Sequence, residues 1–170
     1  DPVIRRRLAA ELEAAGLRPF TAVHPSASFG ARTTVAEGAV VCAGAAISNN
    51  VRLGRHVQVN PNATIGHDAD LRDFVSVNPA AVISGAVVLD EGTLVGAAAT
   101  VLQNLTVGGG SVVGAGAVVT RDVPPGVVVA ATPVTNLGDT SAAQQIAQDF
   151  VAAIAKHRHW DRPNIDAVPA

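Results

Sequence analysis

The chain has 170 residues, which is the size of one domain with short extensions. It is 48% hydrophobic but only 3% aromatic and 15% charged, which excludes charge-driven disorder and requires a core of small aliphatic side chains. The net charge of −2, with 12 Lys and Arg against 14 Asp and Glu, excludes a broad cationic surface for nucleic acid.

The single cysteine, Cys42, excludes an intramolecular disulfide and fits a reducing cytoplasm, the location we expect. Residues 92–120 carry no charge and exceed the roughly 20 residues of a membrane-spanning helix. Polar residues interrupt this run at regular intervals, so a helix would expose polar atoms to lipid on every face, and we expect no membrane contact. The sequence has no methionine, which indicates that a segment upstream has been lost.

The first predicted element is a helix over residues 3–15. Leu8 and Leu12 stand four residues apart, as neighbours on one helical face, and Gly16 follows as a C-terminal stop. We treat residues 1–22 as an N-terminal segment of one helix and one strand.

From Val23 the chain divides into consecutive six-residue units. Seventeen units in a row open with an apolar residue, and the fifth place of nearly every unit holds a small or β-branched one. The openers are Val23, Phe29, Val35, Val41, Ile47, Leu53, Val59, Ile65, Leu71, Val77, Ile83, Leu89, Val95, Val101, Val107, Val113 and Val119.

A period of six fits neither an amphipathic helix nor an ordinary alternating strand. If each unit is a short strand and a bend, three units close a triangular coil of eighteen residues with the openers pointing inward. The sequence therefore predicts an all-β solenoid, a parallel β-helix with short terminal helices, over residues 23–133.

The repeat ends near Val123, where Pro124, Pro125 and Gly126 turn the chain outward before a short strand at 127–130. Residues 134–170 form the C-terminal segment. Within it, residues 141–158 read as an amphipathic helix that caps the prism or packs on a neighbouring subunit.

Among the five histidines, His67 stands directly before a carboxylate, Asp68. A carboxylate that holds an imidazole is what a general base near neutral pH requires, although such a pair can also simply decorate a turn. His24 reads as a turn residue, and His157 and His159 read as a solvated helix end. His56 and His67 do not reproduce the three-histidine zinc site of solenoid carbonic anhydrases, so we expect no metal.

The unbroken hexapeptides resemble the left-handed parallel β-helix acyltransferases. Residues 60–79, Gly85 and the segments 95–102 and 113–119 are similar to the bacterial sugar acetyltransferases of the NeuD and PglD type, over residues 20–133. The resemblance supplies the left hand of the coil. It also implies a homotrimer with acetyl-CoA in the cleft between two adjacent prisms.

The resemblance assigns a role to each matching residue of the catalytic step. His67 takes the proton of an attacking amine or hydroxyl, and Asp68 orients the ring. Asn60 binds the acceptor, and Gly85 gives its backbone N–H to the thioester oxygen.

Ala97 and Ala115 match positions that contact the pantetheine arm, and ordinary corner packing explains both alanines equally well. Ser76 stands where relatives carry a second histidine, so its contact with the cofactor is weaker or replaced. The family also has an N-terminal nucleotide-binding subdomain, of which only residues 1–23 resemble a remnant.

The sequence thus predicts an acetyl-CoA-dependent N- or O-acetyltransferase acting on an amino sugar, nucleotide-linked, or on a comparable small amine. One alternative is an acyltransferase that uses another small-molecule acceptor or acyl carrier protein. Another is a non-catalytic trimeric solenoid scaffold.

Overall fold

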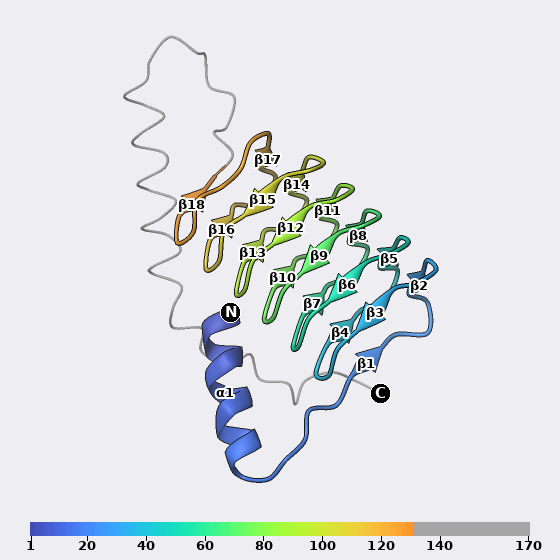
Figure 1. Cartoon of the computed structure of the whole chain (residues 1–170), viewed down its shortest axis with the longest axis vertical. Coiled ribbons are helices and arrows are strands. Elements are labelled where there is room, and N and C mark those ends of the chain that lie inside the picture. The colour runs from blue at the N-terminus through green and yellow to red at the C-terminus, as the bar shows by residue number, and fades with distance from the viewer. Residues whose placement is uncertain (131–170) are drawn as a thin grey trace, which may run out of the picture. The chain divides into compact units, whose positions relative to one another are not determined.

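The six-residue period becomes a coil of three short strands per turn in the computed structural model, which describes residues 1–130 (Figure 1). Each apolar opener is the second residue of a two-residue strand, from Val23 in the first strand to Val119 in the seventeenth. The predicted parallel β-helix is confirmed. The predicted helix at 141–158 lies outside the described residues, and the division into 1–22, 23–133 and 134–170 stays a prediction.

Three flat sheets, here called faces A, B and C, form the sides of the coil. Face A contains β1 (Ala22–Val23), β4 (Val40–Val41), β7 (Gln58–Val59), β10 (Ser76–Val77), β13 (Leu94–Val95), β16 (Val112–Val113) and β18 (Val128–Val129). Face B contains β2 (Ser28–Phe29), β5 (Ala46–Ile47), β8 (Thr64–Ile65), β11 (Val82–Ile83), β14 (Thr100–Val101) and β17 (Val118–Val119). Face C contains β3 (Thr34–Val35), β6 (Arg52–Leu53), β9 (Asp70–Leu71), β12 (Val88–Leu89) and β15 (Thr106–Val107).

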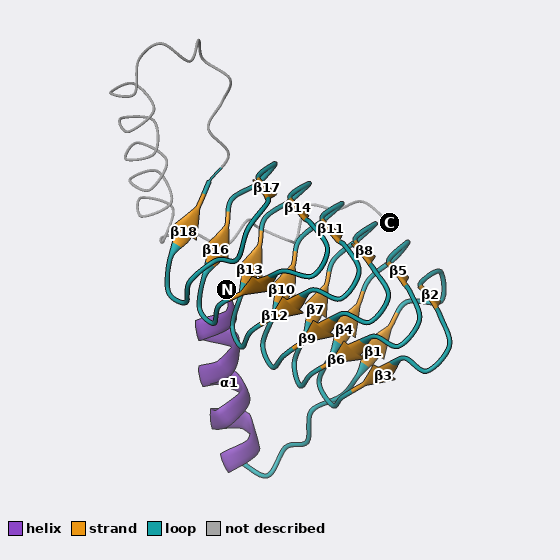
Figure 2. Cartoon of the chain, turned by 45° about the horizontal axis from the view of Figure 1, so that its top comes forward, coloured by secondary structure: helices purple, strands orange, loops and turns teal. Residues whose placement is uncertain are grey.

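All strand pairs are parallel, and the register places each residue beside the one eighteen positions further along, as in Thr64 beside Val82. Figure 2 shows the successive coils stacked in this way. The last coil is shorter, because Val112 pairs with Val128. Residues with the same place in successive coils therefore form straight columns along the prism.

The core is the stack of inward-facing openers and fifth-place residues. Every opener from Val41 to Val119 is buried, and Leu71, Ile83 and Leu89 are completely inaccessible. The openers Val23 and Phe29 are 46% and 39% exposed, because they belong to the first coil, which has no coil beneath it. Only small aliphatic side chains fit this narrow interior, which accounts for the scarcity of aromatic residues.

From residue 32 to residue 116, each bend contains one residue with a left-handed backbone, at the fourth place of the unit. These residues recur every six positions, and ten of them between Arg32 and Asn104 are not glycine. Asn and Asp accept such angles readily, whereas other L-residues are strained there.

The turns that join face A to B, B to C and C to A are called the AB, BC and CA corners.

Helix α1 (Pro2–Ala14) confirms the predicted N-terminal helix, one residue earlier than expected. It begins there because the Asp1 side chain accepts hydrogen bonds from the amides of Val3 and Ile4. Arg5 fastens the helix to the coil, since its guanidinium donates to the carbonyl oxygens of His56 at 3.0 Å and Phe74 at 2.6 Å.

Candidate active site

His67 and Asp68 lie together in the BC corner between β8 and β9. His67 Nδ1 lies 2.7 Å from Asp68 Oδ2, and the two side chains are 66% and 51% exposed. An ionised carboxylate can only accept, so Nδ1 carries the proton and donates to Asp68. The other ring nitrogen, Nε2, is left as an acceptor, which is the form that a general base needs.

Asp68 is held from a second direction by Asn50, one coil below in the same corner. Asn50 Nδ2 donates to Asp68 Oδ1 at 2.9 Å. The hydrogen bonds from His67 and Asn50, in that order, hold the pKa of the Asp68 carboxyl below its ordinary value. Asp68 therefore stays negatively charged and remains an acceptor for the imidazole throughout the neutral range.

Gly85 lies one coil above His67, directly against the imidazole ring. A Cβ atom at Gly85 would lie 2.6 Å from His67 Nε2 and 2.7 Å from Cε1, which is closer than atoms can pack. Within residues 1–130, the neighbouring amides of Ser84 and Ala86 have carbonyl acceptors, but no hydrogen bond engages the Gly85 amide. The base and an available N–H donor therefore lie side by side.

Asn60, Ala97 and Ala115 lie in the AB corner, on the opposite edge of face B. The Asn60 amide donates to Val77 O at 3.0 Å and accepts from Gln58 at 3.2 Å. Ala97 and Ala115 are exposed and occupy the same place in adjacent coils.

Ser76 lies in β10 on face A and belongs to neither of these corners. It is 3% exposed, and its hydroxyl accepts a hydrogen bond from Arg5 of α1 at 3.0 Å. Its predicted role in cofactor binding stays a prediction.

Apart from Ser76, the structure thus separates the predicted site residues into two groups. His67, Asp68 and Gly85 meet at the BC corner, while the residues predicted to bind the acceptor and the pantetheine arm lie at the AB corner. Asn50 was not identified from the sequence. Its spacing of eighteen residues from Asp68 is the signal that reveals it once the coil length is known.

Two other histidines have local structural partners. His24 lies in a turn, as predicted, and its Nδ1 is 2.9 Å from the Oγ of Ser26. His56 is buried and stacks on Phe74 with ring centroids 5.0 Å apart. His157 and His159 lie outside the described residues. Across residues 1–130, no group of three or more His, Cys, Asp and Glu side chains could hold a metal ion.

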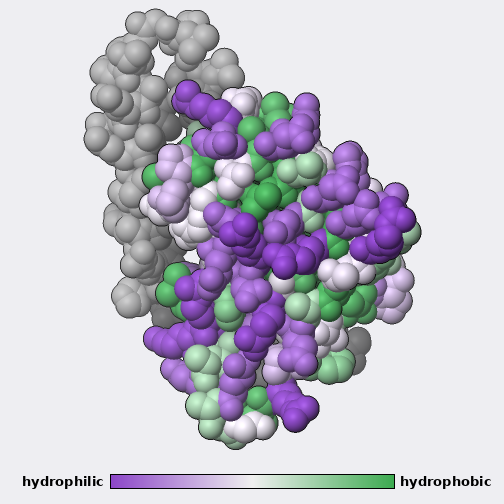
Figure 3. Space-filling view, viewed as in Figure 1, coloured by the Kyte–Doolittle hydropathy of each residue, from purple (hydrophilic) through white to green (hydrophobic). Residues whose placement is uncertain are grey.

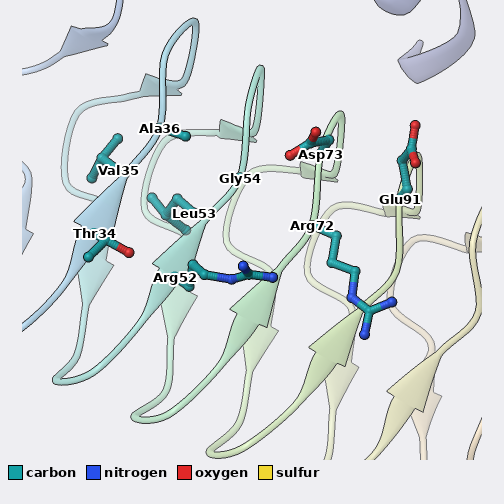
Figure 4. Close-up of a pocket in the computed structure, with 9 residues that line it drawn as sticks. All are labelled: Thr34, Val35, Ala36, Arg52, Leu53, Gly54, Arg72, Asp73 and Glu91. Carbon is teal, nitrogen blue, oxygen red and sulfur yellow. The ribbon is translucent and has the colours of Figure 1, made fainter.

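A pocket of about 560 Å³ lies on face C and extends to the CA corner, as Figure 4 shows. Its two arginines are already paired, since Arg52 lies 2.8 Å from Asp70 and Arg72 lies 2.8 Å from Asp90. Hydrophilic residues cover much of the surface seen in Figure 3. None of the predicted site residues lines this pocket.

No helix in the described part of the chain is long and apolar enough to cross a membrane.

Solved structures of sugar-modifying enzymes are similar to this chain. A GDP-perosamine N-acetyltransferase from Caulobacter crescentus, solved as a histidine-to-asparagine variant with CoA and GDP-perosamine, has 32% identity and a TM-score of 0.76. The match covers 82% of this chain and 66% of that enzyme. The acetyltransferase domain of PglB from Neisseria gonorrhoeae has 35% identity and a TM-score of 0.74, covering 80% of this chain and 66% of that domain.

WeeI from Acinetobacter baumannii has 28% identity and a TM-score of 0.75, covering 78% of this chain and 65% of that protein. The present chain therefore spans somewhat less than two thirds of the length of each of these proteins. No protein-family model and no curated protein sequence matches the chain.

Proposed function

We propose that the chain is a hexapeptide-repeat acyltransferase that transfers the acetyl group of acetyl-CoA to the amino group of a nucleotide-linked amino sugar. The observation that carries this proposal is the His67–Asp68 pair, 2.7 Å apart, whose free ring nitrogen lies against Gly85. The similar structures support the choice of reactants. One contains CoA and GDP-perosamine, and the PglB domain was also solved with acetyl coenzyme A.

The reaction follows from the atoms at the BC corner. His67 Nε2 takes a proton from the acceptor amine as its nitrogen attacks the thioester carbonyl carbon. Charge that develops on the carbonyl oxygen is stabilised by the Gly85 N–H, a contribution of about 2.7–4 kcal/mol for a donor of this kind. When the C–S bond breaks, the proton held by His67 passes to the departing sulfur, which restores the neutral imidazole.

Asp68 supports both stages of this proton transfer. Its carboxylate keeps the proton of the resting ring on Nδ1, and it stabilises the imidazolium that forms when Nε2 accepts a second proton. Since the pKa of the Asp68 carboxyl is lowered, the carboxylate does not take the proton itself. His67 is therefore the group that changes its protonation during turnover.

We place the pantetheine arm of CoA at the AB corner. A Cβ at Gly96 would lie 2.5 Å from the Ala115 amide nitrogen, so neighbouring turns are in close contact. Ala97 and Ala115 project only a methyl group from this corner. A narrow chain can thus approach the backbone closely, and Asn60 lies in the same corner.

A homotrimer brings the two corners together. Within one prism the whole of face B separates His67 from Ala97 and Ala115, so a site that uses both groups needs the BC corner of one chain and the AB corner of another. The outward positions of face B contain no charged residue, which favours burial of this face against a neighbour. Those positions are Ser28, Gly30, Ala46, Ser48, Thr64, Gly66, Val82, Ser84, Thr100, Leu102, Val118 and Thr120.

The proposal is tested by measuring thiol release from acetyl-CoA at neutral pH with a panel of 4-amino nucleotide sugars, hydroxyl-bearing sugars and free small amines. We expect turnover of a nucleotide-linked amino sugar and a loss of about 10²- to 10⁴-fold in His67→Ala. His24→Ala is the matched control, because His24 is an exposed turn histidine outside the proposed site, and it should retain full activity.

Other outcomes of this assay identify the alternatives. Transfer only to hydroxyl groups or to non-nucleotide amines contradicts the proposed acceptor. Transfer only from acyl carrier protein contradicts the proposed donor. A folded chain that binds no CoA species and releases no thiol contradicts the enzymatic proposal and favours a scaffold.

A further inference from the structure

Three polar side chains are stacked along the BC corner and end at the proposed catalytic base. Arg32, Asn50 and Asp68 are eighteen residues apart and occupy the fourth place of their turns in three consecutive coils. Their φ angles are 58°, 59° and 58°, so the three side chains leave the backbone in the same direction. In the next coil this place holds Ala86, which has no polar side chain, so the column stops at Asp68.

Hydrogen bonds join the three side chains. Arg32 Nε donates to Asn50 Oδ1 at 2.6 Å, and Asn50 Nδ2 donates to Asp68 Oδ1 at 2.9 Å. A guanidinium can only donate and an ionised carboxylate can only accept. The Asn50 amide therefore has one favourable orientation, because a flipped amide would face both partners with the wrong group.

This orientation determines how Asp68 meets His67. With Oδ1 engaged by Asn50, the carboxylate presents Oδ2 to His67 Nδ1 at 2.7 Å. The ring is thereby held with its proton on Nδ1 and with Nε2 beside Gly85. His67 and Asp68 are both exposed, so packing does little to restrain them. The hydrogen bonds of the column restrain them instead.

We propose that Asn50 and Arg32 are positioning residues of the acyl-transfer site, which act through Asp68 to hold the His67 imidazole in its reactive tautomer and orientation. This inference rests on the proposed function. Neither residue touches the reacting atoms. They act by lowering the fraction of molecules in which the His67 ring is turned away from its reactive orientation.

The test compares Asn50→Ala, Arg32→Ala and Arg32→Lys. Loss of one exposed, charge-assisted hydrogen bond lowers kcat about three- to tenfold in Asn50→Ala, with KM for acetyl-CoA unchanged. Arg32→Ala has a smaller effect because Asn50 can still reach Asp68, and Arg32→Lys restores activity because it keeps a charged donor. Asn104→Ala is the control, since Asn104 has the same turn position in the same corner and a φ of 59°.

A second measurement does not depend on turnover. Side-chain ¹⁵N NMR of His67, assigned by the signal that disappears in His67→Ala, should show the Nδ1–H tautomer in the unaltered chain and a mixture of tautomers in Asn50→Ala. Unchanged tautomers in Asn50→Ala, or a loss of kcat no greater than in Asn104→Ala, overturns the inference. If no acceptor is turned over, the proposed function fails, and the NMR result still decides whether the column orients His67.

Discussion

Replacing Gly85 by alanine adds one methyl group where the imidazole of His67 now lies. The new Cβ would be 2.6 Å from Nε2 and 2.7 Å from Cε1, whereas non-bonded atoms pack at about 3.5–4.0 Å. The ring must therefore move by about 1 Å. The Gly85 backbone can accept a side chain, because its φ is outside the left-handed region, and the alanine keeps the amide N–H.

The expected loss of activity follows from this displacement. Misplacing a catalytic group by about 1 Å costs on the order of 10²-fold in rate, or about 2.7 kcal/mol of transition-state stabilisation. Stability should change by less than about 1 kcal/mol, because the exposed ring moves into solvent and alanine restricts the unfolded chain. The substitution thus separates catalysis from folding.

The assay is steady-state thiol release together with urea unfolding of Gly85→Ala. Gly109→Ala is the matched control, since Gly109 occupies the same place of a turn in the CA corner and the atom nearest its added Cβ would be Glu91 O at 3.1 Å. We expect full activity in the control. A folded Gly85→Ala protein with kcat within about twofold of the unaltered chain would refute the reasoning, because such a difference is too small for a displaced base.

Three further substitutions, one of them with a control, test other parts of the structure. Leu71→Ala, in the completely buried core, should lower the free energy of unfolding by about 2–5 kcal/mol in urea titrations, whereas Leu17→Ala, at a residue that is 58% exposed, should change it by less than about 0.5 kcal/mol. Arg5→Ala removes the donor shared by the carbonyls of His56 and Phe74, and should weaken the attachment of α1 to the coil by about 1–3 kcal/mol. Amide hydrogen exchange should then become faster throughout α1, and unchanged exchange contradicts this role. The pKa of Asp68 is lower in the folded chain, so its stabilising effect is complete above about pH 4 and is lost as the pH falls through the folded value. Asp68→Asn should therefore be less stable than the unaltered chain at pH 7 and equally stable in strong acid, and an equal difference at both pH values contradicts the assignment.

Most of the fold could be predicted from the sequence because each six-residue unit corresponds to one strand and one bend. Each opener occupies the inward position of one strand, and the spacing of eighteen residues sets the register. The exposure of Val23 and Phe29 was not predicted, since periodicity does not describe the ends of a stack. The attachment of α1 through Arg5 depends on contacts distant in sequence, which a local pattern does not contain.

The candidate site was predictable to a different degree. The pairing of His67 with Asp68 follows from their adjacency, and the position of Gly85 follows from the coil length. The roles of Asn50 and Arg32 were not predicted, because exposed turn residues of these types are common. Their contacts become visible only when the coils are stacked in the structure. The distribution of the predicted residues over two corners became visible only once the faces were known.

The most direct test of the account is subunit complementation between two inactive chains, His67→Ala and Ala115→Trp. The first lacks the base at the BC corner, and the second blocks the pantetheine edge at the AB corner. If each site combines corners from two chains, randomly mixed trimers formed from equal amounts of both variants should recover about one quarter of the unaltered activity per site. If the mixture stays as inactive as the separate variants while mixed trimers are shown to form, the site does not lie between chains and the account is wrong.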